Sequence, residues 1–179
     1  MPRPSLRSLL RAIAAAAAAT IVVMFIYAAV QQTYRSGAND PQVQLAQDAA
    51  ERLRAGAVPM AVLPPDTIDL QWGLAPFVIV YDAQNLALAG SGRLDGAIPV
   101  PPEGVIERAR TQGWNSVTWM PRRSVRVAAV LRAVDDRSGR VVLAARSLRE
   151  VEERESRLLV MAALAWAGLL VASVAAALL

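Results

Sequence analysis

Two long apolar segments stand on either side of a polar segment, and they predict two helices that cross a membrane. No charged residue occurs from Ala12 to Val30 or from Leu158 to Leu179. A helix rises about 1.5 Å per residue, so roughly 20 apolar residues span a hydrocarbon core of about 30 Å. We therefore expect two membrane helices with one small folded domain, residues 31–157, between them.

The first half of the polar segment predicts a helix and then two strands. Asn39 or Asp40 is suited to cap a helix that ends near Ala55. The run Phe77–Tyr81 is rich in β-branched and aromatic residues, which is typical of a strand buried on both faces. A polar turn follows and leads into a second expected strand at 86–90.

The second half of the polar segment predicts a helix and three strands. A proline pair introduces a helix that ends at Gln112. The three strands are expected at 116–120, 125–134 and 140–145. Ser147 and Glu150 have the spacing of a capping box, which predicts a helix that continues into the second apolar segment. The predicted fold class is α+β, with an antiparallel sheet between two transmembrane helices.

Composition changes this picture mainly by excluding several kinds of chemistry. All 19 basic residues are arginine, and the chain has no lysine, histidine or cysteine. These absences exclude a histidine-based triad, a thiolate nucleophile, a usual zinc site and a Walker lysine. Catalysis by carboxylates alone is not excluded, but no pattern in the sequence proposes it. We therefore expect a protein that is not an enzyme and has neither a cofactor nor a metal site.

The basic charge of the chain has a local origin. Arg3, Arg7 and Arg11 stand in the N-terminal tail, residues 1–11, without an acidic neighbour, whereas the middle segment is close to neutral. No basic cluster for a phosphate backbone is visible, so we expect no nucleic-acid partner. The positive-inside rule places the tail in the cytoplasm and the domain on the extracytoplasmic side.

Two observations favour other topologies. A basic tail before an apolar run is also typical of a signal peptide, but this run is long and lacks a clear cleavage site. Four arginines flank the second apolar segment on its predicted outer side, Arg146, Arg149, Arg154 and Arg157. Long domains cross the membrane largely regardless of charge. We therefore keep the prediction of two anchors and an extracytoplasmic domain.

Two motifs look chemical but are better interpreted as loops. Gly90, Gly92 and Gly96 resemble a dinucleotide-binding fingerprint, but the spacing of the later glycines is one residue too long and prolines follow. Asp135 and Asp136 form an acidic pair, and adjacent acids in a hairpin loop are usually solvated turn residues. Neither motif changes the expectation of a chain without cofactor or metal.

The order of these elements resembles the extracytoplasmic PAS-like (PDC/Cache-type) sensor domains of bacterial histidine kinases and chemoreceptors. The segment 77–82 followed by 86–89, then the three-strand tail and its exit helix, carry the resemblance. It implies that the strand ending in Tyr-Asp opens the central sheet and that the last strand feeds the second membrane helix. Sensor kinases continue beyond that helix into a relay and a kinase core, whereas this sequence stops at Leu179. Any output is therefore expected to pass to a separate partner.

Three functions follow from this resemblance. The first is a sensor or ligand-binding module that acts in signal transduction through a partner membrane protein. The second is a structural or accessory membrane protein whose PAS-like domain binds no ligand. The third is the sensor half of a split or truncated histidine kinase.

Four residues are candidates for a ligand pocket, because PAS-like domains leave one sheet face toward a cavity. Tyr81 and Trp119 would supply aromatic walls, and Arg126 and Arg146 would bind a small anionic ligand through bidentate hydrogen bonds. The alternative is that both aromatic residues belong to the core and both arginines are exposed at the sheet edge.

One further pattern concerns association within the bilayer. Gly168, Ala172 and Ala176 lie four residues apart and form a ridge of small residues along the second span. Such a ridge lets two helix backbones approach closely. It predicts pairing with the first span, or with a second copy or a partner membrane protein, although an alanine-rich chain produces ridges of this kind by chance.

Overall fold

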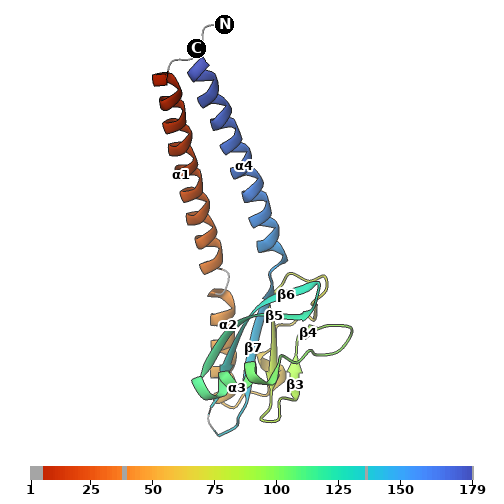
Figure 1. The fold of residues 1–179 in the computed structure, drawn as a ribbon. Helices are drawn as coiled ribbons and strands as arrows, with labels where there is room; N and C mark the ends of the chain where they lie inside the picture. The colour runs from red at the N-terminus through yellow and green to blue at the C-terminus, as the bar shows by residue number, and fades with distance from the viewer. Residues whose placement is uncertain (1–5, 38–39, 136, 179) are drawn as a thin grey trace. The chain divides into compact units, whose positions relative to one another are not determined.

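Two units make up the chain in the computed structural model, a pair of terminal helices and a unit built on a β-sheet (Figure 1). The helix unit contains residues 1–35 and 151–179, and the sheet unit contains Ser36–Glu150. The structure describes residues 6–37, 40–135 and 137–178. Four residues used in the sequence analysis lie outside these ranges: Arg3, Asn39, Asp136 and Leu179.

The helix unit consists of most of α1, Leu6–Gly37, and most of α4, Arg149–Leu178. Both helices are long and apolar enough to cross a membrane, over Leu6–Thr33 and Arg149–Ala176. Helix α1 therefore begins inside the segment expected to be a tail. Helix α4 begins two residues after Ser147, because Ser147 still belongs to the preceding strand. Ser147 nevertheless bonds the start of the helix as a cap does, because its hydroxyl oxygen accepts a hydrogen bond from the Arg149 N–H at 3.3 Å.

Five antiparallel strands form the main sheet, in the spatial order β3-β2-β7-β6-β5. They are β2 (Phe77–Tyr81), β3 (Ala87–Gly90), β5 (Trp114–Arg122), β6 (Val125–Ala133) and β7 (Val141–Ser147). All five were expected from the sequence. Strand β5 extends two residues further at each end than predicted, because it pairs with β6 from Trp114 to Arg122.

Helix α2, Asp40–Arg54, covers one face of this sheet. Its buried residues Ala46, Ala49 and Leu53 join a core cluster with alternate residues of the central strands. Those strand residues are Val78, Val80, Val130, Val142 and Ala144. Side chains along a strand alternate between the two faces of the sheet. Every second residue of these strands therefore faces α2, and these residues are apolar.

Helix α3, Glu103–Gln112, packs on the opposite face through Ile106 and Ala109. The cluster on this side takes the other set of alternate strand residues, Phe77, Ile79, Tyr81, Trp119, Val127, Ala129, Leu131, Leu143 and Ala145. All five residues of β2 are buried, as the sequence predicted for a strand covered on both sides.

Three short elements were not expected from the sequence. They are the 3-10 helix η1 (Pro59–Val62) and the parallel strands β1 (Ile68–Asp69) and β4 (Gly92–Arg93). The chain crosses from β3 to β4 at the buried Ser91, whose hydroxyl oxygen accepts a hydrogen bond from the Val78 N–H at 2.9 Å. The same hydroxyl donates to the Val78 carbonyl at 3.3 Å. Ser91 thus ties the two-stranded sheet of β1 and β4 to β2 of the main sheet.

Candidate functional site

The two aromatic candidates lie in the core on the α3 face. Tyr81 is fully buried, and its hydroxyl donates a hydrogen bond to the Pro99 carbonyl at 2.7 Å. Burial raises the pKa of Tyr81 far above its usual range, because the phenolate would lose its hydration. Trp119 is 6% exposed and belongs to the same core cluster. Both side chains therefore fill space between the sheet and α3.

The two arginine candidates lie on the α2 face instead. Arg146 is opposite Ala128 in the ladder, and Arg126 alternates with the core residues Val125 and Val127. Arg146 donates from Nε to the Leu74 carbonyl at 3.1 Å and forms an ion pair with Glu150 at 2.7 Å. The structure thus brings the arginines to one sheet face and the aromatic residues to the other. The four side chains do not line one cavity.

A different pair of arginines meets an aromatic ring at one end of the sheet. A pocket of about 450 Å³ is lined there by Arg54, Gln112, Gly113, Trp114, Arg132, Ala133, Val134 and Asp135. Trp114 and Arg132 are direct partners in the β5–β6 ladder, so their side chains stand side by side. Arg54 reaches the pocket from the last turn of α2 and donates from Nε to the Val134 carbonyl at 2.9 Å.

Among the described residues that line this pocket, two arginines and one aspartate carry charge. Asp135 accepts hydrogen bonds from the N–H groups of Arg137, at 2.9 Å, and Ser138, at 2.6 Å. These bonds, the Ser138 bond above all, hold the pKa of Asp135 below its usual range. The Asp135 carboxylate is therefore charged at neutral pH and already bonded to its own loop, and Arg54 and Arg132 leave an excess of positive charge.

The chemistry of the pocket suits a small anion with an apolar body. Guanidinium groups bind carboxylates and phosphates through paired, charge-assisted hydrogen bonds. The indole of Trp114 is 52% exposed and offers a flat apolar surface beside Arg132. The sequence predicted arginines beside aromatic rings at Tyr81, Trp119, Arg126 and Arg146. The structure has two arginines beside an aromatic ring at other residues, Arg54, Arg132 and Trp114.

A second cavity, of about 360 Å³, lies beside β3 and η1. Its walls combine prolines and aliphatic side chains with polar groups, and Arg93 is its charged residue. It contains none of the four predicted residues.

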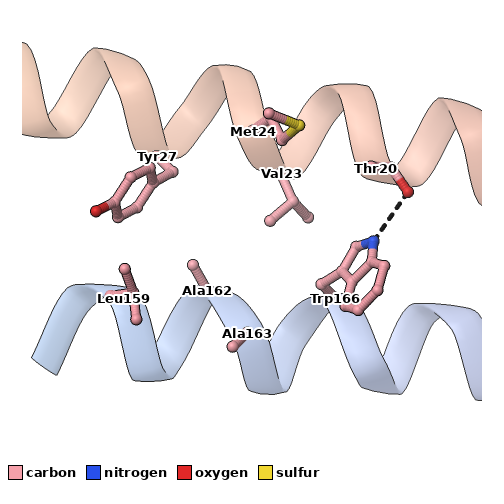
Figure 2. Close-up of a pocket in the computed structure, with 8 residues that line it drawn as sticks. All are labelled: Thr20, Val23, Met24, Tyr27, Leu159, Ala162, Ala163 and Trp166. Carbon is pink, nitrogen blue, oxygen red and sulfur yellow. Dashed lines mark hydrogen bonds between the residues drawn. The ribbon is translucent and has the colours of Figure 1, made fainter. Parts of the chain in front are cut away.

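Inside the helix unit, an open apolar groove of about 320 Å³ lies between α1 and α4 (Figure 2). Helix α1 contributes Thr20, Val23, Met24 and Tyr27, and helix α4 contributes Leu159, Ala162, Ala163 and Trp166. The Trp166 indole N–H donates to the Thr20 hydroxyl at 2.8 Å. The Thr20 hydroxyl itself donates to the Ala16 carbonyl at 2.8 Å. The bond from Trp166 favours pairing of apolar helices, since the indole N–H would find no partner in hydrocarbon.

The ridge of small residues is not part of this contact. Gly168, Ala172 and Ala176 are exposed, and a methyl group placed on Gly168 would meet no heavy atom within 4 Å. The ridge therefore does not pair α4 with α1 in the described residues. Its pairing with another chain stays a prediction.

Comparison with family models, curated proteins and solved structures found no match to this chain. The resemblance to PAS-like domains therefore stays an expectation that rests on the order of elements in the sequence alone.

Sequence reasoning missed the pocket at Arg54, Arg132 and Trp114 because the pocket depends on strand register. Trp114 lies before the strand expected at 116–120, but in the structure it is the first residue of β5. The available signal was the short connection, residues 121–124, between the strands expected at 116–120 and 125–134. A hairpin that tight fixes which residues face each other, and it would have paired Trp114 with a residue near Arg132.

Proposed function

We propose that the chain is a membrane-anchored sensor module whose sheet domain binds a small anion and acts through a separate membrane partner. The joint between β7 and α4 is the observation that carries this proposal. Strand β7 ends at Ser147 and α4 begins at Arg149, so a single residue separates the sheet from the exit helix. That residue, Leu148, still donates its N–H to the Arg126 carbonyl at 2.9 Å.

Two arginines bind the joint to a neighbouring loop. Arg146, before the joint, donates to the Leu74 carbonyl, and Arg149, after it, donates to the Gln71 carbonyl. The loop at 71–74 therefore contacts both sides of the joint. A rearrangement of this loop or of β7 would move the first turn of α4, and this is the kind of coupling that a sensor requires.

The proposal places the sheet domain outside the cytoplasm of a bacterium, with both apolar helices in the inner membrane. Two helices of sufficient length and hydropathy support the membrane assignment. Arg7 and Arg11 near the start of α1 support an N-terminus on the cytoplasmic side. The resemblance to PAS-like sensor domains is supported by β2 lying inside the sheet and by β7 leading directly into α4.

The pocket at Arg54, Arg132 and Trp114 is the proposed ligand site. Replacing Arg132 with Gln should weaken the binding of benzoate by about 10- to 100-fold, because a hydrogen bond to a charged group contributes about 1.5–3 kcal/mol. Calorimetric titration of the full chain in lipid nanodiscs measures this change. Benzamide, the uncharged analogue, should bind poorly to both proteins.

Arg108→Gln provides the matched control for this substitution. Arg108 is exposed on α3 and does not line the pocket, so its loss changes the net charge equally without removing a ligand contact. Equal benzoate affinity in Arg132→Gln and the unmodified chain would refute the site, and so would equal affinity for benzamide.

The topology is tested with reporter fusions. Alkaline phosphatase inserted at Asp136 should be active, because the domain is proposed to lie outside the cytoplasm, where the enzyme acquires its disulfides. Green fluorescent protein fused after Leu179 should be fluorescent, because both termini are proposed to lie in the cytoplasm. An inactive phosphatase at Asp136 together with a dark fusion after Leu179 would indicate the opposite orientation.

A second candidate function is an accessory membrane protein whose domain binds no ligand. The packed α3 face favours it, because Tyr81 and Trp119 occupy the side of the sheet that the resemblance assigns to a cavity. Mass spectrometry of small molecules that co-purify with the full chain separates the two. A bound anion that Arg132→Gln removes would support the sensor, whereas a protein free of small molecules would support the accessory role.

A further inference from the structure

Strand β5 forms one edge of the main sheet and carries no charge over most of its length. It is the last strand in the order β3-β2-β7-β6-β5. No charged residue and no proline occurs from Trp114 to Met120. Edge strands are commonly protected by charge, proline or a covering segment, because their free backbone groups pair with other chains. The centre of β5 has neither charge nor proline to protect it.

The backbone groups of β5 that face the open edge follow from the ladder. The Gly113 carbonyl accepts a hydrogen bond from the Ala133 N–H, and the next pair is Trp114 with Arg132. Bonded and non-bonded pairs alternate in an antiparallel ladder, so the even-numbered residues turn their N–H and C=O groups outward. These residues are Trp114, Ser116 and Thr118. Within the described ranges, no backbone bond from another element reaches them.

We propose that β5 pairs antiparallel with β5 of a second copy, around a two-fold axis at Val117, and so joins two main sheets into one. In this register Ser116 of each copy is opposite Thr118 of the other, and the two residues exchange backbone hydrogen bonds. Trp114 is opposite Met120, and each of these side chains is 52% exposed in the single chain. An indole and a thioether pack favourably, and paired hydroxyl residues bond across strands.

Charge is compatible with this pairing. No charged side chains meet between Trp114 and Met120. The pairing is also self-complementary, as a two-fold interface requires.

Disulfide trapping in membranes tests the register. The chain has no cysteine of its own, so a single introduced cysteine reports alone. In Val117→Cys the two thiols face each other in a non-bonded pair with Cα atoms about 4.5 Å apart, which suits a disulfide. In Met120→Cys the two thiols lie six residues apart along the strands, about 20 Å, and cannot join. Copper phenanthroline should therefore give disulfide-linked dimers of Val117→Cys and not of Met120→Cys.

A second experiment removes the pairing while it preserves the fold. Ser116→Lys with Thr118→Lys in the Val117→Cys chain sets like charges opposite each other, and should lower the dimer yield roughly tenfold or more. Both side chains are exposed, so folding should be unaffected. Gln44→Lys with Gln84→Lys is the matched control, since these exposed residues lie on α2 and on a turn away from β5.

Two results would overturn the proposal. One is equal trapping at positions 117 and 120, which indicates random collision. The other is trapping that survives the two lysines on β5 and disappears with Gly168→Leu and Ala172→Leu, which would assign the dimer to the ridge on α4. The β5 proposal stands independently of the anion pocket, because no arm of this experiment depends on a ligand.

Discussion

Gly92→Ala is expected to lower the free energy of unfolding of the sheet unit by about 3 kcal/mol. The added methyl group would overlap the Phe77 ring and lie 2.9 Å from Leu70 Cδ1. Phe77 and Leu70 are both buried, so neither side chain has room to move away. Urea denaturation of the full chain in detergent, followed by tryptophan fluorescence, measures the loss. Folded proteins are typically stable by about 5–15 kcal/mol, so a loss of about 3 kcal/mol is a large fraction of the free energy of unfolding.

Gly104→Ala is the control for Gly92→Ala. A methyl group on Gly104 meets no heavy atom within 4 Å, and Gly104 lies in helix α3. Alanine is favoured over glycine in a helix, so stability should stay the same or rise by up to about 1 kcal/mol. Equal stabilities of the Gly92→Ala and Gly104→Ala chains would contradict the close approach of β4 to the core.

The stability of the sheet unit is expected to fall steeply above about pH 10, because of Tyr81. In the unfolded chain this phenol ionises near pH 10, whereas burial keeps it protonated in the folded chain and raises its pKa. The unfolded state then binds fewer protons than the folded state. Above about pH 10 the free energy of unfolding therefore decreases by about 1.4 kcal/mol per pH unit. Below about pH 10 the stabilising contribution of the protonated Tyr81 is fully present.

Two tyrosine substitutions separate Tyr81 from other alkaline effects. Tyr81→Phe should remove the decrease between about pH 10 and 12, at the cost of the hydrogen bond to Pro99. Tyr27→Phe should retain the decrease, because Tyr27 belongs to the helix unit. Urea denaturation across this range provides the slope. The same slope in Tyr81→Phe and the unmodified chain would show that another group causes it.

The elements of the fold were largely predictable because their signals are local. The apolar run of β2 and the stripe of Ala49 and Leu53 on α2 are visible within a few residues, and both are buried in the structure. The two apolar helices were likewise evident from composition. Pattern recognition over short windows is sufficient for features of this kind.

The candidate site was less predictable because it depends on long-range register. Alternation along β6 already separates Arg126 from Val127, but only the pairing of Val127 with Trp119 places the tryptophan on the opposite face from that arginine. Arg110 shows the same limit. It donates to the Gly139 carbonyl at 2.9 Å, the Asp82 carbonyl at 2.7 Å and the Asn85 side-chain oxygen at 2.7 Å, all more than 20 residues away in the sequence. No local pattern indicates these partners.

The central position of β7 also determines how the sheet unit resists mechanical force. Strand β7 is bonded to β2 on one side and to β6 on the other, and its end continues into α4. Ladder hydrogen bonds run perpendicular to the strands. Tension applied along β7 through α4 would therefore load both ladders in shear, and many bonds would have to break together. Tension applied through α2 would meet no strand ladder, so a force across the two ends of the unit should peel away α2 and leave β7 in place.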